Sequence, residues 1–164
     1  MLHTELTIPG ARGIAEGLRE RLVTDLNQNL ATLSDLAAAY KQAHWNVTGA
    51  HFGQLHALFD QFHGQIGDYV DTIAERARAL GGIVHGTIQA AVEHSALPPF
   101  PLDECDQQRL VEELVLRTDR TVSGLRQAMD ASATEPATQD VYIEVVRGIE
   151  KQRWMLQSHL AVTS

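Results

Sequence analysis

Apolar side chains recur at steps of three and four residues along most of the chain, which is the spacing of one face of an α-helix. The first such stretch runs from Ile14 to His44 and contains no proline. Its apolar positions are Ile14, Leu18, Leu22, Leu26, Leu30, Leu33, Leu36, Ala37 and Tyr40. The spacing predicts one long amphipathic helix. The segment 46–51, which contains Gly49, predicts that this helix ends there.

The same pattern predicts three further long helices. The second runs from about Phe52 to Leu80 and stops at Gly81-Gly82, since glycine is common just past a helix end. The third covers residues 106–131, and the fourth begins at Thr134-Glu135-Pro136. The sequence shows no strand-like alternation and no internal repeat.

The connector from Ile83 to Pro101 is long for a helical bundle. Residues Thr87 to His94 are expected to form a short helix within it, before prolines forbid continuation. One long crossover is what a ferritin-like bundle needs, whereas an up-down-up-down bundle uses short loops. The predicted fold is therefore all-α: a ferritin-like four-helix bundle with one long crossover connection carrying a short helix. We expect a single domain over residues 14–164, preceded by a short N-terminal tail over residues 1–13.

The composition narrows the class of protein. The chain has 164 residues, 44% of them apolar, so one hydrophobic core can form. No apolar run reaches about 18 residues, and residues 1–13 lack the regions of a signal peptide, so we expect a cytoplasmic protein without membrane association. Cys105 is the only cysteine, which excludes an intrachain disulfide. The net charge of −8 opposes binding to the phosphates of nucleic acid.

Ionisable side chains form a strip along the predicted helix 52–80, beside the face expected to enter the core. The strip carries His56, Asp60, His63, Asp71 and Glu75, and the core face carries Leu55, Phe59, Phe62, Ile66, Ile73, Ala77 and Leu80. A solvated face is the simplest interpretation of such a strip. Gly64 and Gly67 lie on it as well, although glycine within a helix costs about 1 kcal/mol relative to alanine. Two glycines on one face suggest that another element packs closely there.

The strip is symmetric in sequence about Gln65 and Ile66. If two copies of the helix cross antiparallel at that point, His56 lies level with the partner's Glu75, and Asp60 lies level with the partner's Asp71. Within one chain Asp60 and Asp71 cannot share a metal ion, because the intervening helix separates them by about 16 Å. Carboxylates brought face to face repel one another unless a cation lies between them. The sequence therefore favours two metal sites at an interface between two subunits.

The types of ligand indicate which metals suit such sites. Carboxylates combined with imidazole, without thiolate, suit Fe(II), Mn(II) or Zn(II). The chain contains no Glu-x-x-His motif, which is the usual ligand pair of a di-iron centre built inside one subunit. This absence agrees with a site between subunits.

Three segments resemble the Dps family, the miniferritins of starved bacterial cells. They are residues 41–49 (Lys-Gln-Ala-His-Trp-Asn-Val-Thr-Gly), then Phe52 with Leu55-His56 and Phe59-Asp60, and residues 71–76 (Asp-Thr-Ile-Ala-Glu-Arg) followed by Leu80-Gly81-Gly82. The resemblance extends over essentially the whole chain, including the crossover connector and Trp154.

The resemblance implies a shell of twelve identical subunits around a hollow core, with ferroxidase sites at two-fold interfaces. It implies that His44, His56 and Asp60 come from one subunit and that Asp71 and Glu75 come from its partner. It also implies oxidation of Fe(II), preferably by hydrogen peroxide, and storage of the ferric mineral in the shell. These activities protect a cell against oxidative damage. Zn or Mn can compete for the same ligands, because zinc ranks above iron in intrinsic affinity.

Residues around these ligands have two interpretations each. Trp45 resembles the family's aromatic residue that absorbs oxidising equivalents, or it packs at an interface. His63 is an outer ligand or an exposed surface histidine. Asp140 and Glu144 belong to an acidic pore through which iron enters, or their negative charges offset the positive end of the helix dipole at the start of the last helix. Two remaining expectations are that Arg76 forms an ion pair with Glu150, and that the histidines without ligand spacing are not ligands: His3, His51, His85, His94 and His159.

Two other functions compete with iron storage. In the first, the chain is a nucleoid-associated structural protein that protects DNA and has an incidental metal site. Family members that bind DNA directly usually carry a lysine-rich tail, whereas residues 1–13 contain only Arg12 as a basic side chain, offset by Glu5, and residues 157–164 contain no lysine or arginine. DNA binding is therefore doubtful. In the second, the chain is a helical interaction module with a zinc-stabilised dimer, which predicts a small assembly and no oxidation of Fe(II).

Overall fold

Five helices make up most of residues 12–160, the part of the chain that the computed structural model describes. They are α1 (Glu16–Asn46), α2 (Phe52–Ala79), α3 (Ile88–His94), α4 (Gln107–Ala131) and α5 (Pro136–Leu160). The start of each predicted helix is confirmed to within two residues. No strand occurs among the described residues, where one isolated bridge joins Thr48 to Asp106. Most of the tail predicted at residues 1–13 lies outside this range.

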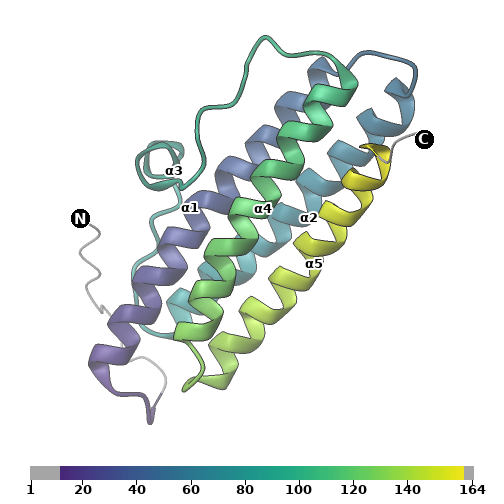
Figure 1. The fold of residues 1–164 in the computed structure, drawn as a ribbon. Helices are drawn as coiled ribbons and strands as arrows, with labels where there is room; N and C mark the ends of the chain where they lie inside the picture. Colours follow the sequence, from purple (N-terminus) through teal and green to yellow (C-terminus); the bar gives the residue numbers. More distant parts are fainter. Residues whose placement is uncertain (1–11, 161–164) are drawn as a thin grey trace.

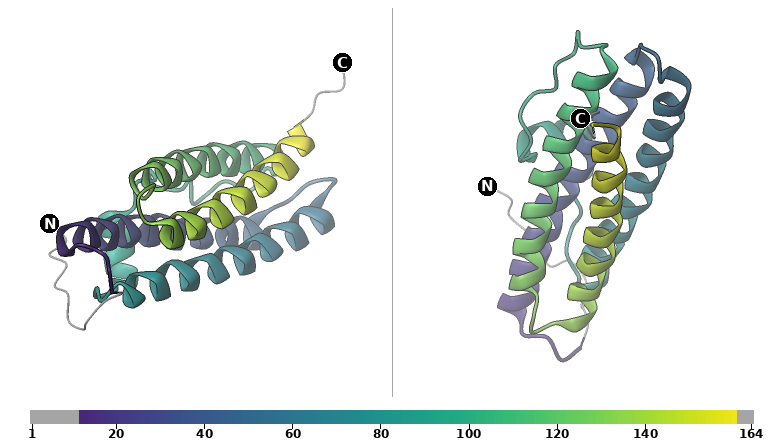
Figure 2. Two further views of the ribbon diagram at one scale, coloured as in Figure 1. Left: turned by 90° about the horizontal axis from the view of Figure 1, so that it is seen from below. Right: turned by 45° about the vertical axis from the view of Figure 1, so that its right-hand side comes forward.

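The four long helices lie side by side, and α3 lies outside the bundle next to α1 (Figure 1). α1 packs most extensively on α2, and α4 on α5. These two pairs form the two layers seen in the left view of Figure 2. The connector carries the chain from one end of the bundle back to the other, so α2 and α4 run in the same direction (Figure 1). This arrangement confirms the ferritin-like bundle with one long crossover.

Local chemistry explains where α2 ends and where α4 begins. Gly81 follows α2 with a φ of +91°, a left-handed conformation that favours glycine. A Cβ atom at the next residue, Gly82, would collide with the side chain of Val23, so the chain passes close to α1 there. At the start of α4, the Asp106 carboxylate accepts hydrogen bonds from the backbone N–H groups of Gln108 and Arg109, each at 3.0 Å. Asp106 therefore caps the helix.

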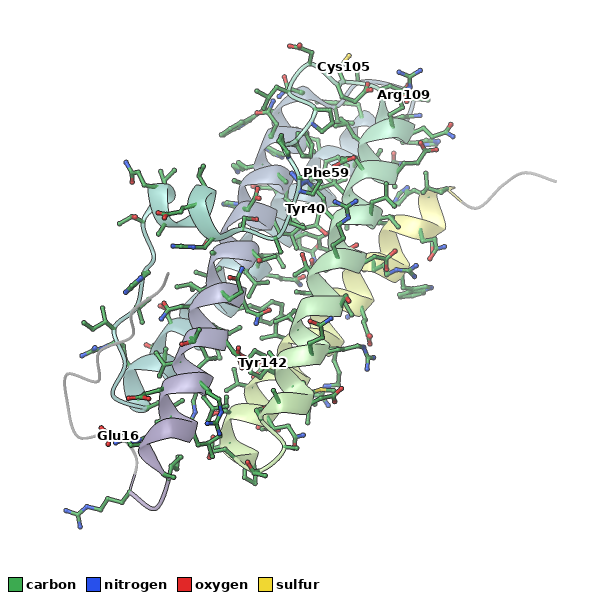
Figure 3. The ribbon with its side chains drawn as sticks, turned by 60° about the vertical axis from the view of Figure 1, so that its left-hand side comes forward. Glu16, Tyr40, Phe59, Cys105, Arg109 and Tyr142 are labelled. Carbon is green, nitrogen blue, oxygen red and sulfur yellow. The ribbon has the colours of Figure 1, made fainter. Side chains whose placement is uncertain are left out.

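The core lies between the two layers and contains the predicted face of α2. The buried residues of that face are Leu55, Phe59, Phe62, Ile66, Ile73, Ala77 and Leu80. Figure 3 shows Tyr40 and Phe59 together between the helices, while Tyr142 lies nearer the other end. Tyr40, Phe59 and Tyr142 are each 0% exposed. Burial of α2 on this face leaves its ionisable strip on the outside of the bundle.

Buried polar side chains fasten the crossover connector to the bundle. The Asn27 amide donates to the carbonyl of Ile83 at 2.9 Å and accepts from the N–H of His85 at 2.8 Å. Arg117 is 1% exposed, and both of its terminal nitrogens donate to the carbonyl of Pro98, at 2.8 and 2.7 Å. Hydrogen bonds of this kind are what allow polar groups to be buried. Within residues 12–160, no helix combines the length and apolar character that crossing a membrane requires.

Candidate metal centre

His44 and His56 lie against each other where α1 ends and α2 begins. The Nδ1 atom of His44 lies 2.7 Å from the carbonyl oxygen of His56, and the Nδ1 atom of His56 lies 2.8 Å from the carbonyl oxygen of His44. The two rings are stacked, with centroids 3.7 Å apart and planes inclined by 22°. This reciprocal pairing explains why two histidines twelve residues apart come together: each ring is bonded to the backbone of the opposite helix.

The hydrogen bonds determine which ring nitrogen can bind a metal ion. A carbonyl oxygen can only accept, so each Nδ1 atom must carry a proton and donate it. In the neutral ring the lone pair then belongs to Nε2. A backbone carbonyl bonded to the other ring nitrogen is the usual partner of a histidine that ligates a metal. His63 has the same arrangement, because its Nδ1 donates to the carbonyl of Ala37 at 2.9 Å.

Asp60 lies beside these histidines and forms an ion pair with Lys41 from α1. The hydrogen bond from the Lys41 ammonium holds the pKa of the Asp60 carboxyl below its usual value, and the positive charge of Lys41 acts in the same direction. The Asp60 side chain is 50% exposed, so it remains accessible to another cation. Lys41 belongs to the segment 41–49 that carries the family resemblance, but its role as the partner of Asp60 was not predicted.

Asp71 and Glu75 lie further along α2, and the structure of one chain does not bring them to the histidines. Both residues are exposed, and neither side chain has a recorded hydrogen bond or ion pair within the described part of the chain. Over residues 12–160, no three or more His, Cys, Asp or Glu side chains gather closely enough to hold a metal ion. Within one chain, Asp60 therefore lies near the paired His44 and His56, whereas Asp71 and Glu75 lie away from them.

The two glycines of the strip, Gly64 and Gly67, are exposed on α2 between Asp60 and Asp71. A Cβ atom added to Gly64 or to Gly67 would meet no other atom within 4 Å. Nothing within residues 12–160 therefore requires glycine at either position, although each glycine costs the helix about 1 kcal/mol relative to alanine.

Arg76 forms an ion pair, but the predicted partner Glu150 was wrong. Its Nη2 atom donates to Glu135 at 2.8 Å, and its Nε atom donates to Thr138 at 2.9 Å. α2 and α5 run in opposite directions, so the end of α2 lies beside the start of α5 (Figure 1). Glu150 lies further along α5. Glu150 instead accepts from Arg126 at 3.1 Å. Arg76 thus anchors the end of α2 that carries Glu75.

Three of the remaining predicted residues lie on the surface. Trp45 is 66% exposed, although it follows a half-buried histidine directly. Asp140 and Glu144 are exposed on the first turns of α5. His63 is half-buried rather than fully exposed. His3 lies outside the described residues.

Comparisons with known proteins agree with this fold. The family described as a ferritin-like domain matches residues 23–164. The DNA protection during starvation protein of Agrobacterium fabrum is 36% identical over 137 residues, covering 82% of this chain and 85% of that protein. The solved structure of DpsA14 from Streptomyces coelicolor is similar with a TM-score of 0.90 and 32% identity, over 94% of this chain and 92% of that one. Mycobacterium smegmatis Dps has a TM-score of 0.91 at 24% identity, which supports the fold alone.

Proposed function

This chain belongs to the Dps family of ferritin-like proteins, and on that basis we propose that it is an iron-storing ferroxidase whose metal sites form between two subunits. The observation that carries the proposal is the reciprocal hydrogen bonding of His44 and His56. It holds both rings in the tautomer that offers Nε2 as a ligand, before any metal ion is present. Fe(II) is the substrate of these sites.

A second copy of the chain supplies the ligands that one chain lacks. In an antiparallel crossing centred on Gln65 and Ile66, the partner's Asp71 and the partner's Glu75 come level with Asp60 and His56. The bare surface at Gly64 and Gly67 supports such a crossing, because two helices approach most closely where neither has a side chain. The contact repeats itself by symmetry, so each pair of subunits makes two equivalent sites.

The ligand set suits the oxidation of iron. Carboxylates are hard ligands that stabilise Fe(III) relative to Fe(II), and the imidazoles leave coordination positions open for an oxidant. Hydrogen peroxide is the oxidant that we propose. Two Fe(II) ions give one electron each, the O–O bond breaks, and the two oxygen atoms take up two protons to leave as two water molecules. Twelve subunits around a hollow core then store the ferric product as a mineral.

DNA protection in this protein follows from the removal of iron and peroxide together. The relative from Agrobacterium fabrum is named for DNA protection. The present chain carries a net charge of −8, and an acidic shell repels the phosphates of a duplex. We therefore expect no retardation of duplex DNA in a gel at physiological salt and neutral pH, in buffer free of metal ions. A stable complex under those conditions would favour the alternative of a DNA-binding structural protein.

The direct test is anaerobic loading with Fe(II) followed by peroxide, with absorbance as the readout and the native mass measured on the same material. His56→Ala and Asp71→Ala should each slow oxidation and leave the helical circular dichroism unchanged. Asp130→Ala is the matched control, because it removes an exposed carboxylate from α4, away from the strip. Rates equal to wild type in both site variants would contradict the assignment of the ligands. A native mass near that of a dimer, without oxidation, would favour the zinc-stabilised module.

A further inference from the structure

A third ring joins the histidine pair where α1 ends and α2 begins. Phe52 is the first residue of α2, and its ring centroid lies 5.1 Å from that of His56, with the planes inclined by 33°. The other neighbour of the His56 ring is His44, stacked on it at 3.7 Å. Within residues 12–160, Phe52 and His44 make no ring contact with each other. Phe52 therefore covers a part of the His56 ring that His44 leaves open.

The helix itself brings Phe52 and His56 together. Residues four apart lie on the same face of a helix, one turn above the other. Helical side chains lean toward the N-terminus, so the His56 ring extends over the turn that begins with Phe52. The N-cap residue of α2, His51, makes no side-chain hydrogen bond to this turn. Phe52 is thus the side chain by which the first turn of α2 contacts the histidine.

The hydrogen bond of His56 does not by itself fix the direction of its ring. Its Nδ1 atom lies 2.8 Å from the carbonyl oxygen of His44, which determines the nitrogen that carries the proton. The ring can still swing about that bond unless its faces are covered. A tilted contact at 5.1 Å lies within the range that aromatic pairs prefer, about 4.5–7 Å between centroids. With rings on two sides, the direction of Nε2 is fixed.

We propose that Phe52 is a positioning residue of the metal centre, which holds the His56 ring so that Nε2 meets the metal ion in one direction. The inference rests on the proposed function, because it takes His56 as a ligand. Phe52 has no ligating atom and acts only through His56. Its side chain is 48% exposed and belongs neither to the hydrophobic core nor to the apolar side chains packed on that core. Core packing therefore does not account for a phenylalanine here.

Anaerobic titration of the assembled protein with Co²⁺, followed by the visible absorption of the bound ion, tests the effect on metal binding. Co²⁺ accepts the same nitrogen and carboxylate ligands as Fe(II). Phe52→Ala should raise the Kd for Co²⁺ about tenfold, the lower end of the loss expected when a contact behind a ligand is removed. Phe52→Tyr keeps the ring and should bind as wild type does. Leu116→Ala is the matched control, because it removes an exposed apolar side chain from α4.

The orientation of His56 can also be measured without metal. In protein labelled with ¹⁵N-histidine, the solid-state NMR signals of His56 are those lost in His56→Ala. Wild type should show one tautomer, protonated at Nδ1, whereas Phe52→Ala should show both tautomers or broadened signals. Phe52→Tyr should resemble wild type. Circular dichroism establishes that the variants fold, and Phe52→Leu, which lacks the flat ring but keeps apolar bulk, takes the place of an alanine variant that does not.

Three results would overturn the proposal. A single His56 tautomer in Phe52→Ala would show that the phenyl ring does not hold the imidazole. Equal losses of Co²⁺ affinity in Phe52→Ala and Phe52→Tyr, or none in either, would show that the aromatic ring is not what matters. An equal loss in Leu116→Ala would show a general effect of surface truncation. Co²⁺ binding that His56→Ala leaves unchanged would instead refute the metal centre, and the NMR comparison would still decide whether Phe52 holds the ring.

Discussion

Co-expression of the two impaired variants, His56→Ala and Asp71→Ala, should restore part of the proposed ferroxidase activity. In the proposed antiparallel crossing, each site takes His56 from one subunit and Asp71 from the other. When one subunit of a pair carries His56→Ala and the other carries Asp71→Ala, both substitutions fall in the same site. The second site of that pair then holds a complete set of ligands. About 16 Å of helix separates Asp60 from Asp71 within one chain, so no rearrangement inside a single subunit can give this result.

The size of the recovery follows from the symmetry of the pair. Random pairing makes half of the pairs mixed, and each mixed pair has one intact site of two. About a quarter of all sites should therefore be complete, because an isologous contact repeats every interaction twice. The initial rate of Fe(II) oxidation by peroxide, per chain, should reach about a quarter of the wild-type rate. Each variant expressed alone should have only its residual rate.

Two controls make the result decisive. The same variants mixed after separate assembly should show no recovery as long as subunits do not exchange, which native mass spectrometry can check. Co-expression of wild type with a chain carrying both substitutions should leave a quarter of the sites intact if the ligands come from two subunits, but half if they come from one. Co-expressed single variants that are no faster than either alone, although mixed pairs are present by mass, would refute the shared site.

Three further substitutions test other parts of the reasoning. A Cβ atom at Gly67 would meet no other atom within 4 Å among the described residues, so Gly67→Leu should keep its helix content while native mass and oxidation rate fall, and an intact assembly would contradict a close crossing at this point. Gly148→Ala places a methyl group against the hydroxyl of Tyr69, and overpacking of this kind should lower the free energy of unfolding by about 1–3 kcal/mol, as measured by denaturant titration. For Glu135, burial raises the pKa, but hydrogen bonds from Thr138 and Arg76 outweigh it and hold the pKa below the usual 4.5 of a glutamate. Glu135 therefore stabilises the fold above that value and loses this contribution as the pH falls through its lower folded pKa, so Glu135→Gln should unfold more easily at neutral pH and show less acid dependence below pH 4.5.

The sequence was most informative where one helix had to present two faces. The core face of α2 could be predicted in full, because burial follows the helical period and no proline or glycine interrupts that face. The position of the ionisable strip outside the core could be predicted for the same reason. The helix positions that avoid the core are either solvated or covered by another molecule, and the prediction from the symmetric spacing of Asp60 and Asp71 is that a second subunit covers them.

Contacts between distant segments could not be predicted in this way. The partner of Arg76 depends on which ends of α2 and α5 meet, and spacing along one helix does not contain that information. Arg117 would be placed on the surface by its charge, yet the carbonyl of Pro98 makes its burial possible.

The ion pair between Lys41 and Asp60 has a consequence for the order of events in the cell. In the proposed site, Asp60 would otherwise lie among other carboxylates without a cation beside it. Here the chain supplies a counter-ion of its own, the ammonium of Lys41, whose side chain is 28% exposed. Under the proposed function, two subunits could then pair without iron, and an arriving Fe(II) ion would replace Lys41 beside Asp60.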